Sequence, residues 1–448
     1  MNGLSAVQRK ALGRIIDLCG DTTLARLEVA ACALSGAGGD ALAVMLRAEG
    51  LDRARRRTAF APLLPLFRPR ADGVQGLIFP AAVLTAVWRE ASARQADMLA
   101  RLDEEGPVTD VIADRFCLAA ASAIRDQGET LWPGTDDDQR AELASCFDLA
   151  HLARRGLRRL PIWIDRPDEE QIAQLRLLMR DAGAVAPDGA RRLTEILFAH
   201  MTEAAACLRI VVQASAATGR DGFLSDSEMG VFVDRLLDAI AVRADRIAAF
   251  GPEATPAEIE AVRTNLVWCA SVLSELDMTV PMPPHGVWEE RTRILRGRIV
   301  SRLQALMRAV EPAVEEVLPM ARVQISGRMV RHVPRLDAPT EGEAVDRART
   351  LLDFVAAVRG PAGVFGCEAQ RTKLVADLDE RLTRYADEAL ELINAGDAPD
   401  EAHAARLVEW VAEGLERIER IEAARTVRRR VAVAGTARGA GTADRSAA

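Results

Sequence analysis

Lysine is almost absent from this sequence: Lys10 and Lys373 are the two examples, so nearly all of the 58 basic side chains are arginine. Asparagine is similarly scarce, and tyrosine occurs once, as Tyr385. The codons of all three residues are AT-rich, so the bias favours a high-GC bacterial genome; arginine selected for phosphate or nucleic-acid recognition is the alternative. The net charge of −8 argues against a nucleic-acid partner, because dedicated nucleic-acid-binding domains usually carry a positive excess.

Aromatic residues make up only 4% of the chain, which argues against a β-rich fold and leaves Leu, Ala, Val and Ile to build the cores. No stretch approaches 18 consecutive apolar residues without charge, so the sequence predicts no membrane-spanning segment. With 49% apolar and 28% charged residues, the composition is typical of a globular protein. A chain of 448 residues is long enough for two to four domains.

The seven cysteines form no CxxC pair, and most of them lie in apolar stretches such as 116–118 and 268–270. An odd number of scattered thiols is typical of a reducing compartment, where cysteine serves as a small core residue. The first twenty residues lack the apolar core and cleavage site of a signal peptide. We therefore expect a cytoplasmic protein.

Apolar residues recur with the period of an α-helix along most of the chain. Four capping boxes mark expected helix starts, at Asp168–Gln171, Ser225–Glu228, Thr255–Glu258 and Thr340–Glu343. Strand signals are confined to residues 322–330, which are compatible with a small hairpin, and to residues 73–79, which are compatible with one short strand. The sequence predicts an all-α, multi-helical fold in which long amphipathic helices form bundles or a solenoid-like stack.

Proline-rich and polar segments suggest where this helical chain divides. We expect boundaries near residues 130, 284 and 335. The tail from 434 contains Gly, Ala, Thr and Ser without large apolar residues and is predicted to be disordered. The predicted regions are an N-terminal helical region (1–130), a central helical region (131–284), a long helix with a linker (285–335), a C-terminal helical hairpin region (336–433) and the tail (434–448).

Motifs for cofactors and nucleophiles are incomplete. Residues 217–228 resemble the second half of a calcium-binding EF-hand loop, but Ala217 and Gly219 supply no side-chain oxygen at its first and third positions. Residues 36–41 match the loose pattern G-x-G-x-x-[GA], for which we expect a turn between two helices and no βαβ unit. The nucleophile motif GxSxG and the Walker motif are absent. The sequence therefore predicts no cofactor, and the missing catalytic motifs argue against an enzyme.

Two His/acid pairs are the candidate metal ligands. His200 and Glu203 are three residues apart, as are Asp148 and His151, and on a helix this spacing places two ligands on one face. The repeated Glu-x-x-His signature of di-metal bundles and the HExxH motif are both missing. A hydrogen-bonded structural histidine is the alternative interpretation of His200.

Arginine clusters are the candidate interaction residues. The first contains Arg53, Arg55, Arg56 and Arg57, and the last contains Arg428, Arg429 and Arg430. A third cluster lies between them, at residues 154–159. Such clusters can grip phosphates, but basic residues late in a helix also complement its dipole, which is the simpler interpretation of the last two clusters.

Three functional hypotheses remain. The first is a helical adaptor or scaffold that acts through a protein partner or self-association, and the predicted helix from Trp288 to Val310 offers either a docking stripe or internal core. The second is an all-α enzyme or metal-dependent protein that uses the His/acid pairs. The third is a binder of nucleic acid or an anionic membrane surface through the arginine clusters.

Overall fold

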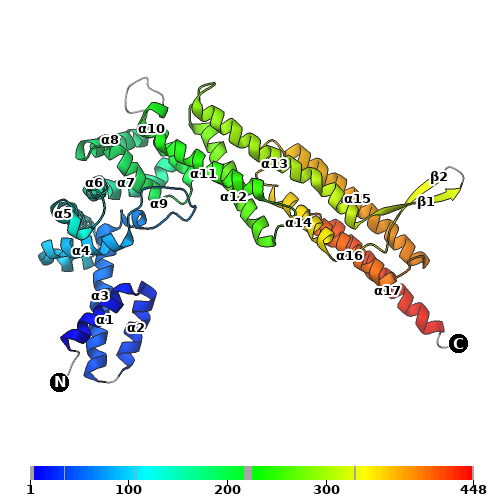
Figure 1. Ribbon diagram of the computed structural model, residues 1–448, viewed down its shortest axis with the longest axis horizontal. Coiled ribbons are helices and arrows are strands. Elements are labelled where there is room, and N and C mark those ends of the chain that lie inside the picture. The colour runs from blue at the N-terminus through cyan, green and yellow to red at the C-terminus, as the bar shows by residue number, and fades with distance from the viewer. Residues whose placement is uncertain (1–4, 35, 105, 216–223, 327–328, 446–448) are drawn as a thin grey trace. The chain divides into compact units, whose positions relative to one another are not determined.

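The computed structural model describes residues 5–34, 36–104, 106–215, 224–326 and 329–445. These residues form helices joined by short connections, together with one antiparallel hairpin of two strands (Figure 1). The prediction of an all-α, multi-helical fold is confirmed. None of the helices in the described ranges combines the length and the apolar character that a membrane span requires.

The chain divides into two compact units, Met1–Val233 and Asp234–Ala448. The elements of the first unit are α1 (Ala6–Leu18), α2 (Asp21–Ala33), α3 (Ala37–Phe60), η1 (Leu64–Phe67), α4 (Ala81–Arg94), η2 (Ala96–Asp103), α5 (Pro107–Leu131), α6 (Asp137–Asp148), α7 (Ala150–Ile164), α8 (Glu169–Val185), α9 (Gly189–His200), η3 (Ala204–Ala206), α10 (Cys207–Ser215) and η5 (Leu224–Asp226). The helix α11 (Gly230–Ala249) begins in this unit and continues into the second.

A cluster of aromatic rings forms the core of the first unit where α3, α4, α5 and α6 meet. The Phe60 ring packs edge-on against Trp88 and Phe147, with centroids 5.5 and 4.8 Å away, and Trp88 stacks on Phe116. All four rings are buried. The indole Nε1 of Trp88 donates to the Asp52 carboxylate at 2.9 Å, so the buried N–H is satisfied within the same cluster.

The second unit continues with α12 (Pro256–Thr279), α13 (Val287–Val317), β1 (Met320–Ser326), β2 (Met329–Pro334), α14 (Glu343–Ala357), α15 (Glu368–Ala395), α16 (Glu401–Arg417) and α17 (Ile421–Arg445). The long helix expected from Trp288 corresponds to α13. Its apolar stripe is internal core and not a docking surface, because every member is buried: Leu295, Ile299, Leu303, Leu306 and Val310.

The hairpin β1–β2 lies where the sequence allowed one. Met320 pairs with Pro334 and Arg322 with His332, and the register shifts between Gln324 and Ser326. Residues 327–328 lie outside the described ranges. The other segment with strand character, residues 73–79, belongs to no strand or helix of the described chain.

Two of the four predicted capping boxes are present as expected. The Thr255 hydroxyl accepts from the Glu258 amide and Asp168 caps α8 with Gln171 as its reciprocal partner. The other two predictions are wrong in position. The helix α14 begins after Gly342, whose φ of +116° favours glycine, and α11 begins at Gly230, beyond the Ser225 box.

The contacts of the chain place its main division at Val233/Asp234, within α11. The boundary expected near residue 130 lies in the last turn of α5, and that near 284 lies in the connection between α12 and α13. The boundary near 335 directly follows β2. The helix α17 continues through Arg445, whereas composition predicts disorder from residue 434; residues 446–448 lie outside the described ranges.

Candidate protein-interaction surface

The predicted His200–Glu203 pair does not share a helical face. The helix α9 ends at His200, and the next residues leave the helix before Glu203. The His200 Nε2 atom lies 2.8 Å from the Pro62 carbonyl oxygen, and burial lowers the pKa of His200. A neutral ring with its hydrogen on Nε2 therefore donates to this carbonyl, which is the structural alternative for His200.

The second candidate pair, Asp148 and His151, spans the junction of α6 and α7. The His151 Nδ1 atom lies 2.9 Å from the Asp148 carbonyl oxygen, and the Asp148 carboxylate forms an ion pair with Arg125. Within the described ranges, no three or more His, Cys, Asp or Glu side chains gather closely enough to hold a metal ion. Of the EF-hand-like segment, residues 217–223 lie outside the described ranges.

Arg53, the first candidate of the N-terminal arginine cluster, is a buried clamp between helices. Its guanidinium donates to the Ile16 and Cys19 carbonyl oxygens at 2.8 and 2.7 Å, which lie at the C-terminal end of α1. It also pairs with Asp21, the first residue of α2, at 3.0 Å and with Glu49 of its own helix at 2.7 Å. The hydrogen bond from Arg53 lowers the pKa of Asp21. This arginine therefore fastens the α1–α2 turn to α3.

The other members of this cluster are also engaged within the chain. Arg55 donates to both carboxylate oxygens of Asp103, at 2.9 and 2.5 Å. Arg56 donates to the Thr85 hydroxyl at 2.8 Å, and Arg57 forms an ion pair with Asp21.

The C-terminal cluster is partly engaged. Arg428 lies between Glu409 and Glu416, and Arg430 pairs with Asp387. Arg429 is exposed and has no hydrogen bond or ion pair among the described residues. Six of the seven candidate arginines are therefore bound to groups of the chain itself.

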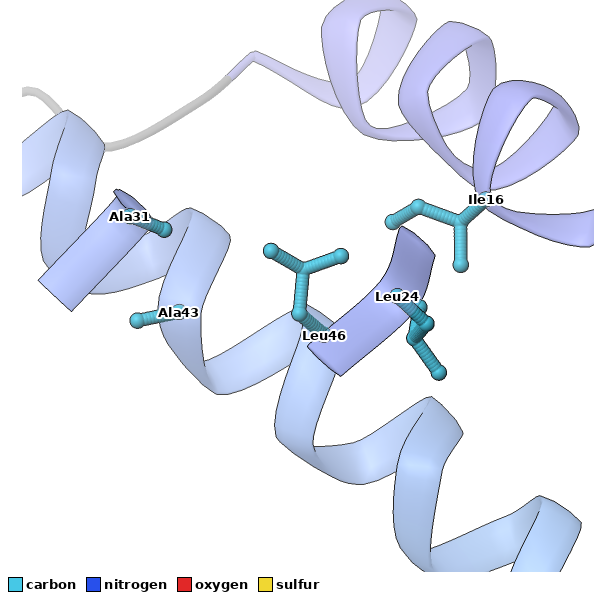
Figure 2. Packing of buried hydrophobic residues seen from close by; sticks show 5 residues of the cluster. All are labelled: Ile16, Leu24, Ala31, Ala43 and Leu46. Carbon is cyan, nitrogen blue, oxygen red and sulfur yellow. The ribbon is translucent and has the colours of Figure 1, made fainter. Parts of the chain in front are cut away.

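The helices α1, α2 and α3 enclose only a small core. Its buried members are Ile16, Leu24, Ala31, Ala43 and Leu46, and Figure 2 shows them gathered from all three helices. Ile16 is the buried residue among the described side chains of α1. Because one buried side chain and the Arg53 clamp hold α1, most of this helix is available to solvent.

The outer face of α1 carries apolar residues that this core does not use. Val7, Ala11, Ile15 and Leu18 are exposed, and their spacing of four, four and three residues places them on one helical face. The exposed fractions of Val7, Ile15 and Leu18 are 78%, 57% and 88%. We call these four residues the α1 stripe. A row of large exposed side chains on a helix marks an interaction site more often than isolated examples do.

The two other helices repeat this pattern. On α3, the exposed residues Val44, Ala48 and Leu51 follow helical spacing, and α2 exposes Val29 between its buried residues Leu24 and Ala31. The helices α1 and α3 are therefore apolar on the side that faces their small core and again on an exposed side, and α2 adds one exposed valine. A bundle that works alone would place polar residues on that second side.

Basic side chains flank one edge of the α1 stripe. Lys10 and Arg14 are exposed there, and neither forms an ion pair or side-chain hydrogen bond with a described residue. Arg9 is also exposed, but helical spacing places it on the opposite face of α1. This differs from the arginine clusters, whose charges are largely matched by carboxylates. The surface formed by α1 combines an apolar row with unmatched positive charge.

Comparison of the chain with protein-family models, with curated proteins and with solved structures gives no match. Sequence patterns drew attention to charged clusters and histidines, whereas the α1 stripe was missed. The helical spacing of Val7, Ala11, Ile15 and Leu18 is visible in the sequence, but Leu12 and Ile16 form a second apolar row with the same kind of spacing. Only the fold tells which of the two rows faces the core.

Proposed function

We propose that this chain is a cytoplasmic helical adaptor whose α1 stripe binds an amphipathic helix with acidic flanks on a partner protein. The observation that carries the proposal is the exposed apolar row of α1 beside two unmatched basic side chains, Lys10 and Arg14. A partner helix would bury the row against its own apolar face and place carboxylates opposite the basic side chains. The cytoplasmic location is supported by seven cysteines, all of them free thiols.

A second copy of the chain fits this surface less well. An antiparallel two-fold symmetric interface would place α1 against α1 and bring Lys10 and Arg14 close to their counterparts. Like charges at an interface oppose association, so the charge pattern favours a different, acidic partner.

Peptide binding tests the proposal. The probe is a fluorescein-labelled synthetic helix with leucines in one row and glutamates on both flanks, and a second peptide carries lysines at the flanking positions. Fluorescence anisotropy should show tighter binding of the glutamate peptide, with a preference that declines as salt is added. Leu18→Ser should weaken binding about tenfold, because burial of a leucine contributes roughly 1.5–3 kcal/mol.

Val287→Ser is the matched control, because Val287 is a similarly exposed residue at the start of α13, with an exposed fraction of 75%. This variant should bind the glutamate peptide as the wild type does. Equal binding of both peptides, or an unchanged affinity in Leu18→Ser, would contradict the proposal. A dimer in light scattering that dissociates in Leu18→Ser would instead assign the stripe to a second copy.

A further inference from the structure

A shallow groove of about 350 Å³ lies between α7 and α8. Three arginines of α7 line it together with the Trp163 ring and with an amide and two apolar side chains of α8: Arg155, Arg158, Arg159, Trp163, Gln174, Leu177 and Leu178. No carboxylate is among the residues that line the groove. Its volume lies at the lower end of the roughly 300–1,000 Å³ range of small-molecule sites.

Two of these guanidinium groups are unmatched. Arg158 forms an ion pair with Asp110 of α5, whereas Arg155 and Arg159 are exposed and have no hydrogen bond or ion pair with any described residue. Their neighbour Arg154 points the other way, to Asp114 at 3.2 Å and the Ala59 carbonyl oxygen at 3.0 Å. Like charges four residues apart on a helix repel each other, so the pair destabilises α7 unless an anion lies between them.

The helix dipole does not account for this cluster. The sequence suggested that the arginines of residues 154–159 stand late in a helix, where positive charge is favourable. The helix α7 continues to Ile164 and has no basic residue in its last turn. The cluster occupies the middle of the helix, and the dipole interpretation is wrong for it.

The walls of the groove are rigid and partly apolar. The Trp163 indole N–H donates to the Gln171 carbonyl oxygen at 3.0 Å, which fixes the ring between α7 and α8. Gly156 lies on the same helix, and a Cβ there would meet Leu178 at 3.0 Å and Leu197 at 3.3 Å. The glycine therefore allows α7 and α8 to pack closely beneath the groove, while Leu177 stays exposed at its edge.

We propose that the α7–α8 groove binds a small organic phosphate. Its phosphoryl group would accept hydrogen bonds from Arg155 and Arg159, whose planar guanidinium groups match phosphate oxygens in pairs. The Gln174 amide would donate to a further oxygen, and the apolar part of the ligand would lie against Leu177. The inference is independent of the adaptor function, because the groove and the α1 stripe share no residue.

Isothermal titration with phenyl phosphate and with inorganic phosphate, on the full-length protein at low ionic strength, tests the inference. Phenyl phosphate should bind more tightly than inorganic phosphate, since only the former has a ring to place against Leu177. Arg155→Gln and Arg159→Gln should each weaken phenyl phosphate binding about tenfold, the effect of losing one charge-assisted contact. Arg166→Gln is the matched control and should bind normally, because Arg166 is exposed just after α7 and has no ion pair with a described residue.

Leu177→Glu provides an independent variant, because it changes an exposed residue without removing an arginine. It should abolish binding of both phosphates by charge repulsion, while circular dichroism reports an unchanged helix content. Absence of binding to the wild type would overturn the inference. Weakening of phenyl phosphate binding in Arg166→Gln as large as in the groove variants would also overturn it, because that result indicates unspecific electrostatic attraction. Equal affinity for the two phosphates would overturn it as well, because the phenyl ring would then contribute nothing to binding.

Discussion

Replacement of Arg53 by methionine should detach α1 while the remainder of the first unit stays folded. The side chain of Arg53 is only 8% exposed, and its guanidinium joins the end of α1 to the start of α2 and to α3. Methionine retains much of the packing volume but none of the donors. The only other buried anchor among the described side chains of α1 is Ile16.

The magnitude follows from the two hydrogen bonds that Arg53 donates to Ile16 and Cys19. A hydrogen bond with a charged partner contributes roughly 1.5–3 kcal/mol. The Asp21 contact adds little, because this carboxylate is 60% exposed and its ion pair is screened by solvent. The Glu49 contact lies within α3 and does not hold α1. We therefore expect a local destabilisation of α1 by about 3 kcal/mol, at the low end for two such bonds.

Hydrogen exchange followed by mass spectrometry measures this change directly. Amides of residues 9–18 should exchange about a hundredfold faster in Arg53→Met, or reach the rate of an unstructured peptide if that comes first. Arg57→Ala is the control, because among the described residues Arg57 makes only the exposed ion pair with Asp21, and its loss should change exchange less than fivefold. If the α1 amides of Arg53→Met exchange at the wild-type rate, Arg53 does not hold α1 in place. If exchange is faster throughout α4–α6 as well, the effect of the substitution is not local.

Three further predictions concern acid, thiols and packing. The lowered pKa of Asp21 contributes a small stability above its unfolded value of about 3.9, and this is lost as the pH falls through the folded value, so the protection factors of the α1 amides should decline slightly below about pH 4. Burial raises the pKa of Cys117 to about 12, so a thiol reagent at pH 8 should label the exposed Cys32 in the native protein and Cys117 only after denaturation. Gly156→Val should lower the midpoint of thermal unfolding through overpacking against Leu178, at a cost of about 1–3 kcal/mol, whereas Gly183→Val, on the open side of α8, should cost less than Gly156→Val.

Features set by neighbouring residues were predictable from the sequence. The capping boxes at Asp168 and Thr255 depend on groups three residues apart, and both are present. The box at Thr340 was misplaced because the chain uses Gly342, with its positive φ, to enter α14. The pair His200 and Glu203 failed for a similar reason: no glycine or proline marks the end of α9.

Roles set by distant contacts were not predictable. The clamp of Arg53 acts on carbonyl groups more than thirty residues earlier in the chain, and no local pattern distinguishes it from Arg57. No sequence pattern distinguishes Arg154 from Arg155 either, although Arg154 forms an ion pair with Asp114 and Arg155 lines the α7–α8 groove. For the same reason, the choice between the two apolar rows of α1 required the position of α3.

Because lysine is so scarce, the α1 surface can be modified selectively. Reagents that acylate amines can modify only two side chains of this protein, Lys10 and Lys373, and both are exposed. Lys10 stands beside the α1 stripe, whereas Lys373 lies on α15 in the second unit. A label, cross-linker or acyl group on a lysine side chain therefore reports on one proposed binding surface and one reference position. Acylation of Lys10 also removes one of the two positive charges that we expect an acidic partner to recognise.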